Sequence, residues 1–169
     1  VTGCWGARPD DTDELARRLA RYLASLVPIA SLFGHWKRSG MRYRSAVPSS
    51  VTLPPSLSEL RDWLDENPCF AARNGRKAHI GYSISAGTAR EERPYAHLWL
   101  HSALAEPQGY LANRTGLSLL TPETDPRSLR QAARPMLLAL ATAWDASWAG
   151  VAAGDFGEQP SKAGLTYLS

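Results

Sequence analysis

The sequence has only two cysteines, Cys4 and Cys69, and this scarcity excludes several classes of protein. Two isolated thiols match none of the paired spacings that bind zinc, and they cannot build the disulfide framework of a small secreted domain. We interpret both as free thiols rather than as one disulfide, which is the usual state in a reducing cytoplasm. A cytoplasmic protein is therefore expected.

Long hydrophobic runs are missing as well. The longest, such as Met136 to Ala141, are far shorter than the roughly 20 residues that a membrane-spanning helix needs. Residues 1–5 are not a charged segment leading into an apolar one, so no signal peptide is visible. No membrane partner is expected. The chain of 169 residues nevertheless has 44% hydrophobic residues and six tryptophans, enough to bury a core.

The charge has little excess of either sign. Nineteen basic residues against 16 acidic ones give a net charge of +3. Proteins that bind nucleic acid usually carry a more one-sided charge, so composition predicts no nucleic-acid partner. One segment, Trp36 to Arg44, interleaves four cations with two aromatic side chains. It keeps a nucleic-acid-binding module open as an alternative function.

Capping residues place two helices in the first part of the chain. Asp11 and Ser56 are good N-caps, and each is followed three residues later by a glutamate that can complete a capping box. Prolines at positions 28 and 68 end the two helices. In the second helix, Leu57, Leu60 and Leu64 form the expected buried stripe.

Alternating patterns place strands around these helices. The short apolar segment from Val1 to Trp5 is expected to be the first strand. Three later segments alternate apolar with polar residues and are separated by polar connections, at 78–86, 95–104 and 110–120. This pattern is typical of an antiparallel meander.

A long apolar stripe then predicts a third helix, with Asp125 or Ser128 as its N-cap. The predicted fold is α+β, a single domain over residues 1–169 with a mostly antiparallel sheet packed against helices. The last residues, 165–169, look like the start of a strand. We therefore expect the natural domain to continue beyond Ser169.

No catalytic template fits the sequence. Residues 81–85 begin like the nucleophile elbow of a hydrolase, but the second glycine is missing and the segment lies within an alternating strand. His97 and His101 would lie roughly 13 Å apart along one strand, too far for a shared zinc ion. Asp145 lies between two tryptophans, but it is interpreted more simply as a helix-terminal residue than as a catalytic acid. No catalytic residue, metal or cofactor is predicted.

Three segments suggest a family. They are Cys4-Trp5-Gly6-Ala7-Arg8-Pro9 before the first helix, Trp144-Asp145-Ala146-Ser147-Trp148 after the third, and Gly164-Leu165-Thr166-Tyr167-Leu168-Ser169. In order and spacing they resemble the immunity protein 52 family of bacterial polymorphic toxin systems. Ala146 stands where that family usually has proline, and Leu165 stands where it usually has tryptophan.

The resemblance implies an antitoxin that is not an enzyme and needs no cofactor. Such a protein binds and neutralises a cognate toxin, or effector, encoded by a neighbouring gene. The toxin is often a nuclease of the restriction-endonuclease fold that is delivered by the type VI secretion system. Inhibition takes place in the cytoplasm of the producing bacterium.

An inhibitor of a basic nuclease is often acidic, whereas this chain is weakly basic. Either its acidic contact surface is local, or the partner surface is not basic, or inhibition does not cover the active site of the toxin. The candidate toxin-binding residues are Asp62, Trp63, Asp65 and Glu66 on the second helix, and Asp10, Asp11 and Asp13 at the first. The acidic residues are otherwise interpreted as solvated charges. Trp63 is interpreted either as an interface anchor or as a core residue. Arg8 is expected to pair with a carboxylate of a helix.

Overall fold

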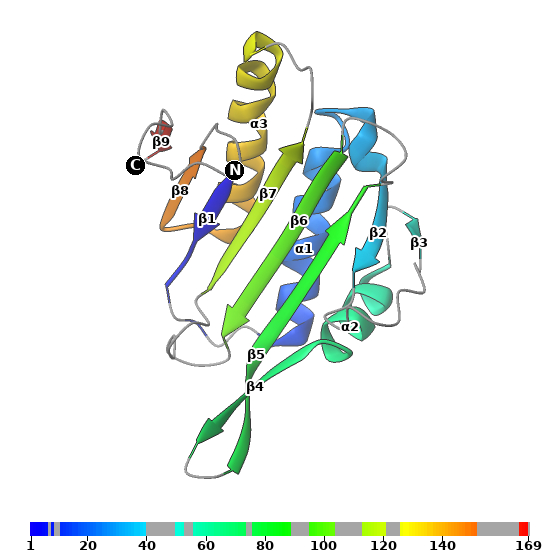
Figure 1. Ribbon diagram of the computed structural model, residues 1–169, viewed down its shortest axis with the longest axis vertical. Coiled ribbons are helices and arrows are strands. Elements are labelled where there is room, and N and C mark those ends of the chain that lie inside the picture. Colours follow the sequence, from blue (N-terminus) through cyan, green and yellow to red (C-terminus); the bar gives the residue numbers. More distant parts are fainter. Residues whose placement is uncertain are drawn as a thin grey trace.

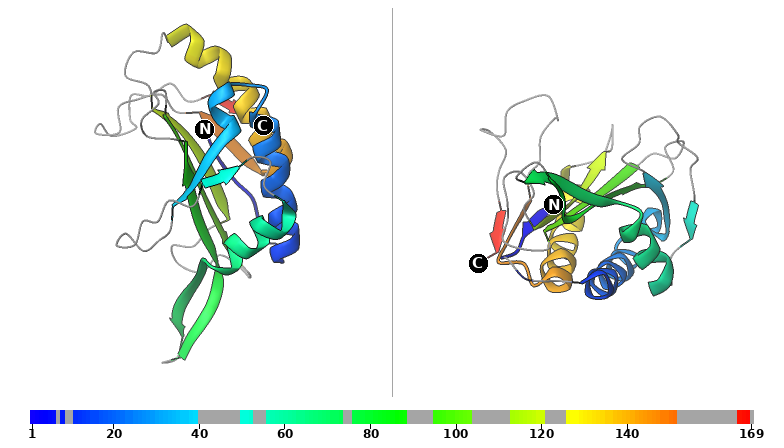
Figure 2. Two further views of the ribbon diagram at one scale, coloured as in Figure 1. Left: turned by 90° about the vertical axis from the view of Figure 1, so that its right-hand side faces the viewer. Right: turned by 90° about the horizontal axis from the view of Figure 1, so that it is seen from below.

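A sheet forms one layer of the protein and helices form the other (Figure 1). The computed structural model describes residues 1–6, 8, 11–39, 50–52, 56–73, 76–88, 95–103, 113–120, 126–151 and 166–168. In the side view of Figure 2 the described helices all lie against the same face of the sheet, and no helix of the described ranges covers the other face. This architecture confirms the predicted α+β domain.

The sheet is antiparallel at every described pairing. The elements, in chain order, are β1 (Thr2–Cys4), α1 (Thr12–Leu26), the 3-10 turn η1 (Ser31–Gly34), β2 (His35–Ser39), β3 (Ser50–Thr52), α2 (Leu57–Asp65), β4 (Pro68–Arg73), β5 (Arg76–Gly87), β6 (Tyr95–Ala103), β7 (Arg114–Leu120), α3 (Pro126–Trp144), β8 (Trp148–Val151) and β9 (Thr166–Leu168). The strand order is β3-β2-β5-β6-β7-β1-β8-β9, and β4 pairs with β5 outside this path.

The central strands β5, β6 and β7 form the predicted meander. Ile84 of β5 lies opposite Leu100 of β6, and Leu98 of β6 lies opposite Leu117 of β7. All four side chains are buried. Directly paired residues share a face of the sheet, so these positions build the side that packs on the helices.

The two predicted N-caps are confirmed, but only one capping box is complete. Asp11 accepts a hydrogen bond from the backbone N–H of Glu14, at 2.8 Å. Ser56 and Glu59 exchange both bonds of the box, at 3.2 and 2.8 Å. Glu14 does not complete its box because its carboxylate pairs with arginines of the same helix.

Two predictions about the helices are wrong. Leu57 is 48% exposed, whereas Leu60 and Leu64 are fully buried. Leu57 shares a helix side with Leu60 and Leu64, but it is the first residue of α2, and helical spacing alone does not bring the end of the helix into the core. Ser128 cannot cap α3, because that helix already begins at Pro126; Asp125 lies outside the described residues. None of the described helices is long and apolar enough to cross a lipid bilayer.

Candidate functional site

The first resembling segment meets the second in the core. The indole rings of Trp5 and Trp144 stack with 4.8 Å between centroids and 12° between planes. Tyr22 of α1 packs edge-on against Trp144, with centroids 6.5 Å apart. All three side chains are buried. The start of the chain, α1 and the end of α3 are therefore joined by one aromatic cluster.

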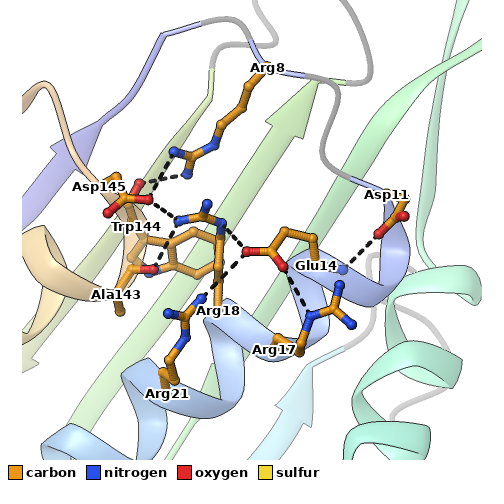
Figure 3. Close-up of polar contacts among 9 residues, drawn as sticks. All are labelled: Arg8, Asp11, Glu14, Arg17, Arg18, Arg21, Ala143, Trp144 and Asp145. Atoms are coloured by element: carbon orange, nitrogen blue, oxygen red, sulfur yellow. Dashed lines mark hydrogen bonds and ion pairs between the residues drawn. The ribbon is translucent and has the colours of Figure 1, made fainter.

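Arg8 lies over this cluster and contacts Trp5, Trp144 and Asp145 (Figure 3). Its guanidinium donates a hydrogen bond to the backbone oxygen of Trp144, at 2.6 Å, and lies 5.3 Å from the centroid of the Trp5 ring. It also lies 3.7 Å from the carboxylate of Asp145. The carboxylate expected as the partner of Arg8 is thus the residue that follows α3.

Asp145 is held in an unusual position. Its φ of 44° lies in the left-handed region, which few residues other than glycine, asparagine and aspartate adopt. Its carboxylate accepts a hydrogen bond from Arg18 at 2.6 Å, while Arg18 also donates to the backbone oxygen of Ala143. This hydrogen bond, followed by the charges of nearby arginines, lowers the pKa of Asp145. A general acid needs a raised pKa, whereas the pKa of Asp145 is lowered. The direction of this shift favours the interpretation of Asp145 as a helix-terminal residue.

Glu14 connects further arginines of α1 to the same group (Figure 3). Its carboxylate lies 3.0 Å from Arg17, 3.0 Å from Arg18 and 3.5 Å from Arg21. Arg17 and Arg21 are more than half exposed, so these outer pairs are screened by water. The result is a basic cluster at the α1–α3 side of the helical layer.

The predicted acidic residues occupy the opposite side of that layer, on α2. Asp62 and Asp65 are exposed, and Glu66 is 67% exposed and lies 3.9 Å from Arg38. Residues spaced by three and four positions share one side of a helix, so these carboxylates form one acidic surface. Trp63 is not part of that surface: it is 3% exposed and packs in the core.

The start of α1 lies beside this acidic surface. Arg61 of α2 forms an ion pair with Asp13 of α1 at 2.5 Å, with both side chains about half exposed. Asp11 is exposed and caps α1, while Asp10 lies outside the described residues. The two acidic groups that the sequence predicts separately therefore adjoin. No local sequence signal could have revealed this, because it depends on how two helices pack.

The segment from Trp36 to Arg44 is not one basic and aromatic surface where it is described. Trp36 is 2% exposed and donates a hydrogen bond to the backbone oxygen of Phe33. Arg38 turns to α2 and donates to the backbone oxygen of Glu59, whereas Lys37 is exposed on the other face. Residues 40–44 lie outside the described part.

Cys4 and Cys69 are free thiols, and burial raises the pKa of the Cys69 thiol. Within the described ranges, no three histidine, cysteine or acidic residues gather in a way that could hold a metal ion. No protein-family model matches the chain, and no curated protein matches it significantly. Its place in the immunity protein 52 family is therefore a proposal.

Proposed function

We propose that the protein is an immunity protein that binds and neutralises a cognate toxin in the bacterial cytoplasm. The toxin would be encoded by a neighbouring gene and would be a nuclease of the restriction-endonuclease fold, delivered by type VI secretion. The resemblance of three segments to the immunity protein 52 family motivates the proposal. Two of these segments contact each other through Trp5, Arg8, Trp144 and Asp145, which gives a structural reason for their occurring together.

The observation that carries the proposed mode of binding is the joined acidic surface of α1 and α2. Asp11, Asp13, Asp62, Asp65 and Glu66 contribute five carboxylates, of which Asp13 pairs with Arg61 and Glu66 lies near Arg38. A nuclease must present a basic surface to nucleic-acid phosphates, and a local acidic surface complements it despite a net charge of +3. Bound there, the protein would occlude the substrate path stoichiometrically, with no chemistry of its own.

The proposal is tested with the toxin encoded by the adjacent gene. Bacteria that co-express toxin and immunity protein should grow, and the two proteins should co-purify. The test variant neutralises the acidic surface with Asp62→Asn, Asp65→Asn and Glu66→Gln. The matched control makes the same change of three charge units on exposed positions of α3, with Gln131→Lys, Leu138→Lys and Thr142→Lys.

We expect the neutralised variant to bind at least about tenfold more weakly, mainly through slower association, because complementary charge steers encounter. The control should bind like the wild type, and circular dichroism should show both variants folded. If the wild type neither binds nor protects, the immunity function is wrong. If it protects but the neutralised variant binds equally well, the acidic surface is wrong and the immunity function stands.

A further inference from the structure

The helix-free face of the sheet carries a second set of ordered side chains. The register of β5, β6 and β7 aligns Ser83, His101 and Arg114 in one row across the strands. The next row contains Ser85, Trp99 and Gly116. These positions alternate with Ile84, Leu100 and Leu117, which face the helices, so they lie on the opposite face of the sheet, where Ser83 and Gly116 are themselves buried. Nothing in the proposed immunity function uses them.

Trp99 lies across its neighbouring strand instead of standing away from the sheet. A methyl group at Gly116 would come within 2.4 Å of two atoms of the Trp99 ring. Glycine at that position therefore makes room for the indole. The guanidinium of Arg114 lies 5.5 Å from the centroid of that ring, and the His101 ring lies 5.5 Å away at 48°. The result is a half-buried aromatic plane with the exposed Arg114 guanidinium over it.

The charge on this face is of one sign. Lys37 of β2 is aligned with Gly87 and His97 in a third row, and Arg114 lies in the first. Burial, followed by the charge of Arg114, lowers the pKa of His101, so this ring adds aromatic surface and no charge at neutral pH. Among the described residues of these rows there is no carboxylate.

Two neighbouring parts of the sheet add a further aromatic residue and further cationic residues. Cys4 of β1 pairs with both Arg114 and Trp148, which places Trp148, 36% exposed, on the same face. In the other direction β5 runs into the hairpin that it forms with β4, which projects beyond the rest of the sheet (Figure 1). The paired end of that hairpin contains Arg73, Arg76 and Lys77.

We propose that the helix-free face of the sheet binds single-stranded nucleic acid. One base stacks on the Trp99 ring in place of the Arg114 guanidinium, which turns with Lys37 to the flanking phosphates. Rows on one face lie roughly 7 Å apart along the strands, so a base on Trp99 leaves its phosphate near Arg114. Exposed aromatic residues on central strands, flanked by cations, are a recurring platform for unpaired bases.

This proposal differs from the expectation drawn from net charge, because that charge is a sum over opposite surfaces. The described acidic residues all lie on α1, on α2 or at the ends of helices. The strands of the helix-free face therefore hold an excess of positive charge that the total of +3 conceals. An acidic protein partner could pair with Lys37 and Arg114. Such a partner would not require the flat Trp99 ring that is held against Gly116.

The experiment measures the fluorescence anisotropy of labelled mixed-sequence DNA and RNA of about 15 nucleotides, a length that spans a typical single-strand site. One variant combines Lys37→Ala with Arg114→Ala. Its matched control, Arg17→Ala with Arg21→Ala, removes two exposed charges from the helical layer. A third variant, Gly116→Ala, retains all aromatic and charged side chains but displaces the indole.

We expect the wild type to bind at low salt, and the Lys37 and Arg114 variant to bind at least about tenfold more weakly. Its slope of log affinity against log salt should be smaller by about 1.4, for two lost phosphate contacts. Gly116→Ala should weaken binding about fivefold or more while circular dichroism remains unchanged, because base stacking on an aromatic ring is lost. The control should retain its affinity.

Three results would overturn the proposal. The first is no binding of either oligonucleotide by the wild type at low salt. The second is an equal loss of affinity in the control, which would assign binding to the helical layer. The third is loss of toxin binding, without any oligonucleotide binding, on changing this face; the face would then contact protein. The first two results need no toxin, so a failure of this proposal is distinguishable from a failure of the immunity function.

Discussion

Replacing Arg8 by alanine is expected to destabilise the domain by about 2 kcal/mol, because one side chain connects the first strand to the end of α3. Its guanidinium bonds to the backbone oxygen of Trp144, approaches Asp145 and lies over the Trp5 ring. The side chain is 22% exposed, so water can replace only part of these interactions. Alanine leaves the carbonyl at the end of α3 without this donor.

The magnitude follows from the separate contacts. A hydrogen bond that involves a charged group contributes about 1.5–3 kcal/mol, and a partly exposed cation–π contact about 0.5–1 kcal/mol. The ion pair with Asp145 adds little, because that carboxylate is 69% exposed and screened by water. Partial hydration of the variant reduces the sum to about 2 kcal/mol. Arg8→Lys should recover only part of it, because an ammonium cannot form the planar two-point contact.

Equilibrium unfolding in urea, followed by circular dichroism, measures this change. For a chain of this size, 2 kcal/mol corresponds to a melting temperature lower by roughly 4–8 °C. The matched control is Arg17→Ala, which removes an arginine that is 52% exposed and pairs only with Glu14 among the described residues; it should cost less than about 0.5 kcal/mol. If Arg8→Ala unfolds within 0.5 kcal/mol of the wild type, about the size of a surface substitution, our account of this contact is refuted.

The remaining predictions concern the same cluster. Tyr22→Phe should leave stability unchanged or raise it by up to about 1–3 kcal/mol, because the buried hydroxyl has no hydrogen-bond partner among the described residues; a clear loss in thermal unfolding would contradict this. Asp145→Asn should be less stable than the wild type at neutral pH, since the hydrogen bond from Arg18 lowers the pKa of Asp145 in the folded state. The difference is fully present above the ordinary pKa of 3.8 and should disappear as the pH falls through the lower folded pKa, which urea unfolding across that range measures. A difference that persists in acid would point to a backbone cause instead.

Short-range signals predicted much of the secondary structure. The capping box of α2 depends on Ser56 and Glu59, three residues apart, so the sequence contains all of it. Alternation in β5 and β6 predicted the burial of Ile84, Leu98 and Leu100, but not that of the polar residues Ser83 and Ser102. β4 was missed because its residues, Pro68–Arg73, do not alternate and begin with proline. The pairing of β4 with β5 shifts register between Cys69 and Phe70, and no pattern in the sequence predicts this irregularity.

The candidate site was predicted only in pieces. Charge and helical spacing were sufficient to group Asp62, Asp65 and Glu66, because neighbours three and four apart must share a helix side. The same reasoning could not decide whether Trp63 belongs to the core or to an interface, since both positions suit a tryptophan. Its burial follows from the packing of α2 against α1 and the sheet.

The sequence by itself determined the helices, the central strands and the charge of each helix side, because these depend on residues a few positions apart. The tertiary structure decided which surfaces exist. It joined Asp13 to Arg61, stacked Trp5 on Trp144 and left one face of the sheet without helices. Such contacts form between elements that lie far apart in the chain, where no spacing rule relates one residue to the other. The acidic surface and the Trp99 platform both belong to this second class.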